Sequence, residues 1–405
     1  MHEMIELPRV AELPPIDPVA DQRILMDMGP IAVPLVNRHI NPERFKDPAT
    51  RDEFPTVTTY MGDKADLWIP ARYVPWSAGE NFAQDYAWNE QESPLYEAAR
   101  SAILIGLLTE DTLPHFTEAL IRRLGVNEAL RFFTNVWTAE EGRHSKFLEG
   151  YVIVGRVIDP IQLEHDRMAN VIAAKVPDPP SSMEALVYVT LQEAATRISH
   201  LNTGKLISDT VVEDERVVAL SADKTELANV EPVVVDRMEP EERASYLRQV
   251  IRAGMTRIVG DENKHHVIYR DLVGGVPQRG NIPQLDGALQ IDPSTMVKAI
   301  ERPVREFDMP GTGIREFWHH AAIIADAGVY DLRIHRDQVL APVLKKWDLE
   351  HIEGLDAEAE QARERIVAHM ANLDIIASEF EERRAAKRAE QMEDPEAIWV
   401  GKKAA

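Results

Sequence analysis

Four long stretches in the middle of the chain have apolar residues at helical spacing, and they constrain the fold more than any other feature. They span residues 93–114, 127–157, 181–206 and 240–273. Each opens on a helix-start signal: Ser93 before Pro94, Asn127, two adjacent serines, and Pro240 before two glutamates. Because a helix with an apolar face must bury it against another element, these stretches predict an all-α helical bundle.

The segments around these stretches are less regular. Residues 17–90 mix short helical patterns with prolines, which predicts a partly irregular N-terminal cover. Residues 206–240 form an inserted connection that contains the β-branched runs RVVAL and PVVVD. We expect this connection to form a hairpin or a lid, or to be disordered. Residues 356–391 predict a long charged helix. We expect a single domain over 1–405, with tails at 1–16 and 390–405.

Composition excludes several kinds of site. The chain has no cysteine, so disulfides, thiolate metal sites, iron–sulfur clusters and cysteine nucleophiles are ruled out, and a metal must bind oxygen and nitrogen ligands. A net charge of -23 argues against nucleic acid as a partner. The acidic, proline-rich start lacks the features of a secretory signal, and no apolar run approaches bilayer-spanning length. We therefore expect a cytoplasmic protein without a membrane span.

Two of the four stretches contain a glutamate followed three residues later by a histidine. These pairs are Glu141 with His144, and Glu262 with His265. At this spacing both side chains leave a helix on one face and can share a metal ion. One such pair alone is weak evidence, because the chain has 13 histidines and a pair with the same spacing can arise by chance.

The glutamates upstream of these two pairs separate them from a chance pair such as Glu316 with His319. Glu110 and Glu193 each stand alone on an otherwise apolar helix face, where a buried carboxylate needs a compensating cation or proton. Two helices with one glutamate and two with Glu-x-x-His form the ligand set of ferritin-like dimetal bundles, and carboxylates with imidazoles suit iron. We therefore predict a ferritin-like bundle in which two iron ions are bound by Glu110, Glu141, His144, Glu193, Glu262 and His265.

Each of these residues taken alone has a plainer interpretation. A single glutamate can be the buried partner of an arginine, and a single histidine can be a core residue bonded to backbone. An acid directly precedes each motif glutamate, as Glu140 and Asp261. Ligating imidazoles usually donate their other N–H to a carboxylate, so these acids are candidates to reach the opposite histidine. A surface acid beside a buried one is an equal alternative.

Around these residues the chain resembles the soluble acyl-ACP (acyl carrier protein) desaturases, that is, the plant stearoyl-ACP desaturase family and its mycobacterial and other actinobacterial members. The matching segments are LLTEDTLPHF, WTAEEGRH, VYVTLQEAATRISHLNTGKL, GDENKHHVIYRDL, LWIPARYVPWSAGEN, DMPGTGIREF and VYDLRIHRDQVLAPVLKKW, so the resemblance covers most of the chain. It implies an oxidoreductase that uses O2 to put a cis double bond into an ACP-bound fatty acyl chain. It also implies a carboxylate-bridged di-iron centre (Fe2+/Fe3+), electrons from ferredoxin, and a homodimer.

The resemblance also assigns roles to single residues. The six predicted ligands fall on the family's iron ligands, and Thr196 falls on the threonine placed beside the metals for oxygen activation. Trp68 and Asp261 fall on a surface tryptophan and an acid that relay electrons toward the iron histidine, here His144. The plainer alternatives are a helix threonine bonded to a carbonyl one turn back, and a tryptophan that only packs.

One departure from the family is the long connection between Thr203 and Asp261, so substrate entry, carrier docking or the dimer contact can differ. An acidic carrier needs a local basic patch, although an ordinary solvated helix face is an equally good interpretation of each candidate. The candidates are Arg122–Arg123, Lys345–Lys346, and Arg383, Arg384, Lys387 and Arg388. Two competing functions remain open: hydroxylation of a carrier-bound substrate, and a scaffold that binds acyl-ACP or iron without turnover.

Overall fold

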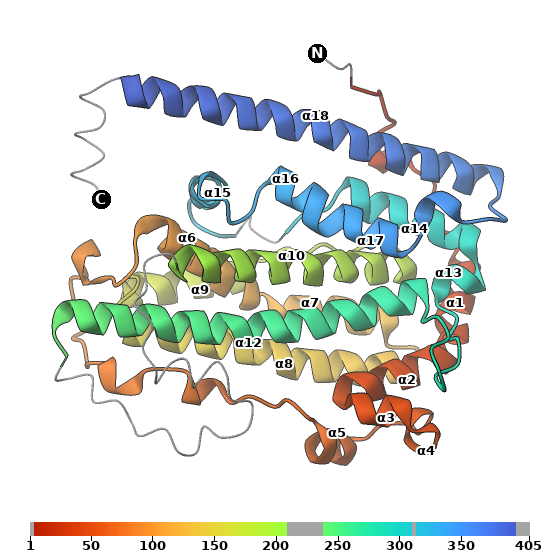
Figure 1. Cartoon of the computed structure of the whole chain (residues 1–405), viewed down its shortest axis with the longest axis horizontal. Coiled ribbons are helices and arrows are strands. Elements are labelled where there is room, and N and C mark those ends of the chain that lie inside the picture. Colours follow the sequence, from red (N-terminus) through yellow and green to blue (C-terminus); the bar gives the residue numbers. More distant parts are fainter. Residues whose placement is uncertain (1–3, 209–237, 310–312, 394–405) are drawn as a thin grey trace.

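The computed structural model of the chain describes residues 4–208, 238–309 and 313–393. Three long helices, α8 (Glu128–Val154), α10 (Ser182–Ser208) and α12 (Pro240–Gly274), lie side by side along the long axis of the molecule (Figure 1). A fourth, α6 (Glu97–Glu110), packs against α8 and α10 and completes the bundle. The predicted all-α fold with a ferritin-like core is confirmed.

Three of the four predicted helix starts are confirmed, and at α10 the Ser181 hydroxyl accepts a hydrogen bond from the backbone N–H of Glu184. The Asn127 side chain accepts hydrogen bonds from the backbone N–H groups of Ala129 and Leu130, and Pro240 occupies the first turn of α12, as predicted. The start expected at Ser93 and Pro94 is wrong, because α6 begins at Glu97. There the Ser93 hydroxyl accepts the backbone N–H of Leu95 at 3.2 Å, so the serine stabilises a turn instead of capping the helix.

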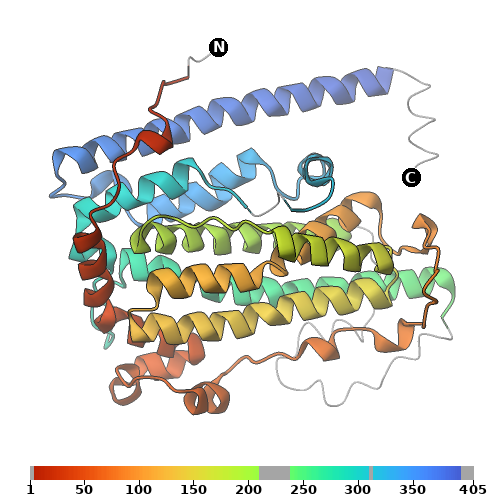
Figure 2. The same cartoon turned by 180° about the vertical axis from the view of Figure 1, so that it is seen from behind.

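A second layer of helices covers one side of the bundle. It contains α14 (Pro293–Arg305), α15 (Phe317–Asp326) and one continuous rod made of α16 (Leu332–Ile334), the π-helical turn η7 (His335–Leu340) and α17 (Ala341–Lys346). The long charged helix predicted at 356–391 is α18 (Ala357–Glu393), which lies over this layer (Figure 1). The N-terminal segment crosses α18, where Ile5 and Asn372 exchange two hydrogen bonds, and then descends along one end of the bundle (Figure 2).

The N-terminal cover is a series of short helices, which confirms the expected irregularity. It comprises α1 (Pro18–Asp27), α2 (Gly29–Ile40), α3 (Pro42–Lys46), α4 (Pro48–Arg51) and α5 (Val57–Asp63). The remaining elements are α7 (Leu113–Leu124), α9 (Pro160–Ala173), α13 (Ala288–Ile291) and the 3-10 turns η1 (Val10–Glu12), η2 (Pro70–Arg72), η3 (Trp76–Ala78), η4 (Glu90–Glu92) and η8 (Leu349–His351). The hairpin or lid expected within 206–240 falls largely on residues 209–237, outside the described residues.

Two apolar clusters fill the bundle, and a polar layer separates them. On α8 the first cluster ends at Trp137 and the second begins at Phe147; on α12 the second cluster ends at Ile258 and the first resumes at Ile268. The two Glu-x-x-His motifs occupy these gaps. In the parts of the chain that the structure describes, no helix is long and apolar enough to cross a membrane.

Candidate metal centre

The polar layer brings the six predicted ligands together, although they come from four different helices. Glu110 is the last residue of α6, Glu193 lies on α10, and the Glu-x-x-His pairs lie on α8 and α12. All six side chains are buried, none more than 9% exposed. The sequence places these residues on separate helices, and they come together in a single cluster only when the bundle forms.

The six residues form two overlapping groups of four that share Glu141 and Glu262. The first half-site adds Glu110 and His144, and the second half-site adds Glu193 and His265. Within each group, one ligand atom from every residue lies within 4.8 Å of the others. The arrangement thus offers each of two ions one imidazole, one carboxylate of its own and two shared carboxylates.

The Nδ1 atoms of the two histidines face the carboxylates. His144 Nδ1 lies 2.8 Å from Oε2 of Glu141, and His265 Nδ1 lies 2.6 Å from Oε1 of the same residue. His144 Nδ1 is also 3.6 Å from Oε1 of Glu262, and His265 Nδ1 is 3.5 Å from Oε2 of Glu193. The two oxygens of Glu141 therefore serve different half-sites, as a bridging carboxylate must.

The donor atoms fit a pair of metal ions. Among the described residues, both Nδ1 atoms, Glu141 Oε1 and Glu193 Oε2 are buried without a hydrogen bond, although such atoms are normally satisfied. None of the four glutamates forms an ion pair with an arginine or lysine of the described chain. Converging, unsatisfied carboxylate and imidazole donors suit iron or manganese.

The electrostatics of the cluster point the same way. Burial raises the pKa of the Glu262 carboxyl well above its ordinary value, and the neighbouring carboxylates Glu141 and Glu193 raise it further. Burial and Glu141 likewise raise the pKa of Glu193. Burial also acts to raise the pKa of Glu141, but the adjacent imidazoles lower it to about 2. Four buried carboxylates against two imidazoles leave negative charge that bound cations would compensate.

Asp261 lies behind the histidine of the first half-site. Its Oδ2 is 3.6 Å from His144 Nε2 and accepts hydrogen bonds from Trp68 Nε1 at 2.7 Å and Arg143 Nη2 at 2.8 Å. The expected surface position of Trp68 is wrong for this chain, because the residue is only 6% exposed. Its ring stacks over His144 and packs edge-on against Phe147, and its N–H donates to Asp261, which is also buried.

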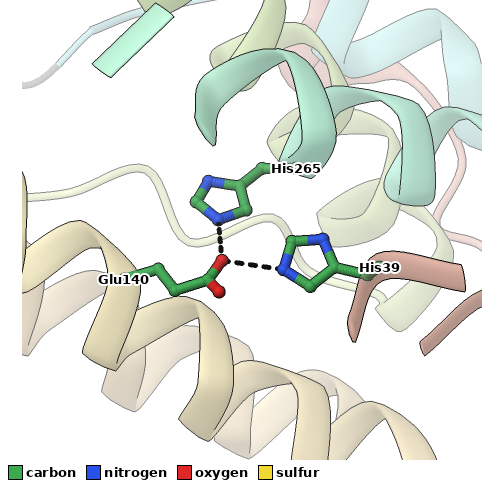
Figure 3. A group of neighbouring side chains, drawn as sticks. All are labelled: His39, Glu140 and His265. Atoms are coloured by element: carbon green, nitrogen blue, oxygen red, sulfur yellow. Dashed lines mark hydrogen bonds and ion pairs between the residues drawn. The ribbon is translucent and has the colours of Figure 1, made fainter. Parts of the chain in front are cut away.

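Glu140 lies behind the histidine of the second half-site and makes more contacts. Its Oε2 accepts hydrogen bonds from His265 Nε2 at 2.8 Å and from His39 Nε2 at 2.7 Å, so the carboxylate lies between two imidazoles (Figure 3). Its Oε1 accepts from the Tyr60 hydroxyl at 2.6 Å and pairs with Lys64 Nζ at 2.7 Å. Because the ammonium group already compensates Glu140, this trio needs no metal of its own.

Glu140 forms a hydrogen bond with the opposite histidine, as the sequence suggested, whereas Asp261 lies 3.6 Å from His144 Nε2, beyond a hydrogen bond. Sequence reasoning missed His39, Tyr60 and Lys64, which lie in the N-terminal cover where no local pattern marks them. It also missed Trp137, whose Nε1–H donates to Glu193 Oε1 at 2.9 Å, and His200, whose Nε2 donates to Glu110 Oε1 at 3.1 Å. These two had a usable signal, since both lie on ligand helices near the motifs.

Thr196 lies beside the predicted ligands and also makes the carbonyl contact of an ordinary helix threonine. Its Oγ1 lies 2.9 Å from Oε2 of Glu262 and 3.1 Å from the backbone carbonyl of Gln192 one turn back. It also lines a small cavity beside the carboxylates. The cavity is lined by Thr109, Glu110, Leu113, Phe116, Trp137, Glu141, Gln192, Glu193, Thr196 and Glu262, so both carboxylates and apolar side chains line it.

The chance pair lies apart from the cluster. Glu316 has a left-handed backbone with φ of 56° at the start of α15, and its side chain is exposed, like that of His319. The nearest carboxylate that pairs with His319 is Glu97, at 4.0 Å. Equal spacing in sequence therefore does not by itself bring a glutamate and a histidine into the buried cluster.

Comparison with known proteins agrees with the geometry. The family model described as fatty acid desaturase matches residues 55–226 and 241–399. The acyl-ACP desaturase DesA1, as it is named in Mycobacterium tuberculosis, is 30% identical over 81% of this chain and 86% of its own length. A chloroplastic acyl-ACP desaturase of Cucumis sativus is 25% identical over 82% of this chain and 74% of its own. In fold, the crystal structure of the acyl-ACP desaturase DesA2 of M. tuberculosis superposes with a TM-score of 0.51 at 18% identity, covering 84% of this chain and 99% of that one. The chain therefore belongs to the fatty acid desaturase family and is an oxidoreductase.

Proposed function

We propose that the protein uses O2 to introduce a cis double bond into a fatty acyl chain carried on ACP. The observation that carries the proposal is the pair of half-sites joined by Glu141 and Glu262, in a member of this family. The names of its relatives in M. tuberculosis and in plants indicate the same carrier-bound substrate class. A cytoplasmic location and a homodimeric state stay predictions.

The reaction removes one hydrogen from each of two adjacent methylenes and reduces O2 to two molecules of water. Two electrons and two protons complete the balance, and we assign the electrons to reduced ferredoxin. Two iron ions held by the six ligands would supply the O2 reduction and the removal of hydrogen from unactivated C–H bonds. The residues of the chain have to hold the acyl group beside that centre and keep bulk water away.

The cavity supports this division of labour. Leu113, Phe116 and Trp137 line it together with the carboxylates, and its volume of about 20 Å³ has room for about one water molecule, so it keeps bulk water from the centre and admits an acyl chain only if these side chains move. Thr196 holds a hydroxyl proton at Oγ1 on the same cavity, where a hydrogen bond to Glu262 is already available. Glu140 holds the His265 ring by a hydrogen bond so that its Nδ1 faces inward, and the Asp261 carboxylate lies 3.6 Å behind the His144 ring.

We assign electron entry to the contact series from Trp68 through Asp261 to His144. The hydrogen bond of 2.7 Å from the indole to Asp261 and the stacking of the indole over His144 support this assignment. For the acidic carrier, Lys345 and Lys346 are the favoured pair, since both side chains are exposed. Arg122 and Arg123 already pair with Asp178, at 2.8 Å and 3.1 Å.

The test is turnover with a panel of acyl-ACPs of different chain length, using purified protein loaded with Fe2+, ferredoxin, a source of electrons and O2. Mass spectrometry of the released acyl group should show the loss of two hydrogens. A gain of one oxygen would identify a hydroxylase instead. Stable iron binding without O2 consumption would identify a scaffold, and no product from any chain length would reject the proposal.

A further inference from the structure

His200 lies against the first half-site. It stands seven residues, or two turns, after Glu193 on the same face of α10, and it is 4% exposed. Its Nε2 is 3.1 Å from Oε1 of Glu110 and 3.9 Å from Oε1 of Glu262. An ionised carboxylate has no proton to donate, so in this contact His200 Nε2 is the donor.

The contact has a counterpart on the other side of the centre. Glu193, the unshared carboxylate of the second half-site, accepts the Trp137 indole N–H at Oε1 and keeps Oε2 without a hydrogen bond. Glu110, the unshared carboxylate of the first half-site, accepts His200 at Oε1. Each unshared carboxylate is thus held by one N–H from a neighbouring helix, which leaves lone pairs for a metal ion.

Packing holds the His200 imidazole in place in addition to its hydrogen bond. Gly106 lies one turn before Glu110 on α6, and a Cβ added to Gly106 would lie 3.4 Å from Cε1 of His200. The ring therefore packs directly on the α6 backbone, beside the residue that it holds. A side chain held by both packing and a hydrogen bond can position a ligand without loss of further rotamer freedom.

We infer that His200 is a positioning residue for the first half-site, which it stabilises by holding the Glu110 carboxylate for its metal ion. The inference rests on the proposed di-iron function and extends it to a residue outside the ligand set. Ligating carboxylates depend on such hydrogen bonds, and their loss typically weakens metal binding about 10- to 100-fold.

The test is anaerobic titration of the metal-free protein with Fe2+, followed by equilibrium dialysis. The wild type should bind two ions per chain. In His200→Leu, one of the two should bind about 10- to 100-fold more weakly, while the other keeps its wild-type affinity. His200→Gln, which restores a side-chain N–H donor, should recover most of the loss.

The matched control is His335→Leu, which removes another buried histidine whose hydrogen-bond partner is the hydroxyl of Tyr330 and not a carboxylate. It should keep both affinities, and the thermal midpoint of each variant identifies one that fails to fold. Wild-type affinity for both ions in a folded His200→Leu protein would overturn the inference, as would a His200→Gln protein as weak as His200→Leu. A wild type that binds no iron would instead refute the di-iron function itself.

Discussion

The two half-sites use the same kinds of ligand but are supported by different residues. Each has one histidine and one unshared glutamate, with Glu141 and Glu262 in common. The acid behind the first histidine, Asp261, is 3.6 Å from the imidazole and is bonded by one indole and one guanidinium. The acid behind the second is 2.8 Å away and is bonded by an imidazole, a phenol and an ammonium group.

The difference shows that the N-terminal cover is part of the centre. Three of the groups around Glu140 come from residues 39–64, whereas Asp261 is bonded partly from α8 itself. The Lys64 side chain is 2% exposed, so its charge depends on Glu140 for compensation. The second half-site is therefore coupled to the folding of the cover more tightly than the first.

Loss of a shared carboxylate should have the largest effect, because it removes a ligand from both half-sites. Glu141→Gln is expected to lower bound iron below one ion per chain and to abolish desaturation, since the two oxygens of Glu141 face both imidazoles. Metal analysis of the purified protein checks this. Glu316→Gln, in the exposed pair of the same spacing, is the control and should keep full iron content. An iron content of two in Glu141→Gln would refute the bridging arrangement.

The supporting acids should differ in their effect on stability. Glu140→Gln removes the carboxylate that pairs with the buried ammonium of Lys64 and should lower the free energy of unfolding of the metal-free protein by about 3–5 kcal/mol. Asp261→Asn should cost less, because Arg143 still has Glu140 at 3.8 Å. Urea denaturation measures both.

A double variant sharpens this comparison. Adding Lys64→Met to Glu140→Gln removes the stranded charge and should recover part of the lost stability. Equal losses for Glu140→Gln and Asp261→Asn, with no recovery in the double variant, would mean that the two half-sites are coupled equally to the fold.

The two tryptophans at the centre should separate iron binding from electron entry. Trp137→Phe removes the N–H that holds Glu193 and should weaken iron at the second half-site about 10- to 100-fold. Trp68→Phe leaves Asp261 bonded to Arg143, so iron affinity should change little while reduction by ferredoxin slows. Iron titration and stopped-flow reduction distinguish the two. A Trp68→Phe protein reduced at the wild-type rate would remove Trp68 from the electron route.

The smallest effect concerns a histidine outside the centre. Burial, with a smaller contribution from His369, lowers the pKa of His335 from 6.5 to about 4. Between these values the unfolded chain binds a proton that the folded protein does not, so stability falls as the pH drops from 6.5 toward 4. His335→Gln should make urea stability of the metal-free protein less dependent on pH over that range. An unchanged slope would show that His335 is protonated in the folded protein.

Local sequence patterns were sufficient to predict the long helices and the six side chains that converge in the polar layer. The Asn127 cap, the Glu-x-x-His spacing and the lone glutamates on apolar faces all depend on residues within a few positions of one another on one helix. The start of α6 was wrong, because Ser93 and Pro94 favour a turn as well as a helix start, and only packing decides between them. Packing likewise decides that the pair of Glu316 and His319 is exposed while the other two Glu-x-x-His pairs are buried.

The chain by itself thus determined which side chains can bind metal, since a helix places residues three apart on one face whatever surrounds it. Only the tertiary structure decided what supports them. His39 meets Glu140 across 101 positions, Tyr60 meets it across 80, and His200 meets Glu110 across 90. Contacts over such separations leave no periodic trace, because they depend on how whole helices pack and not on the rise of any one of them.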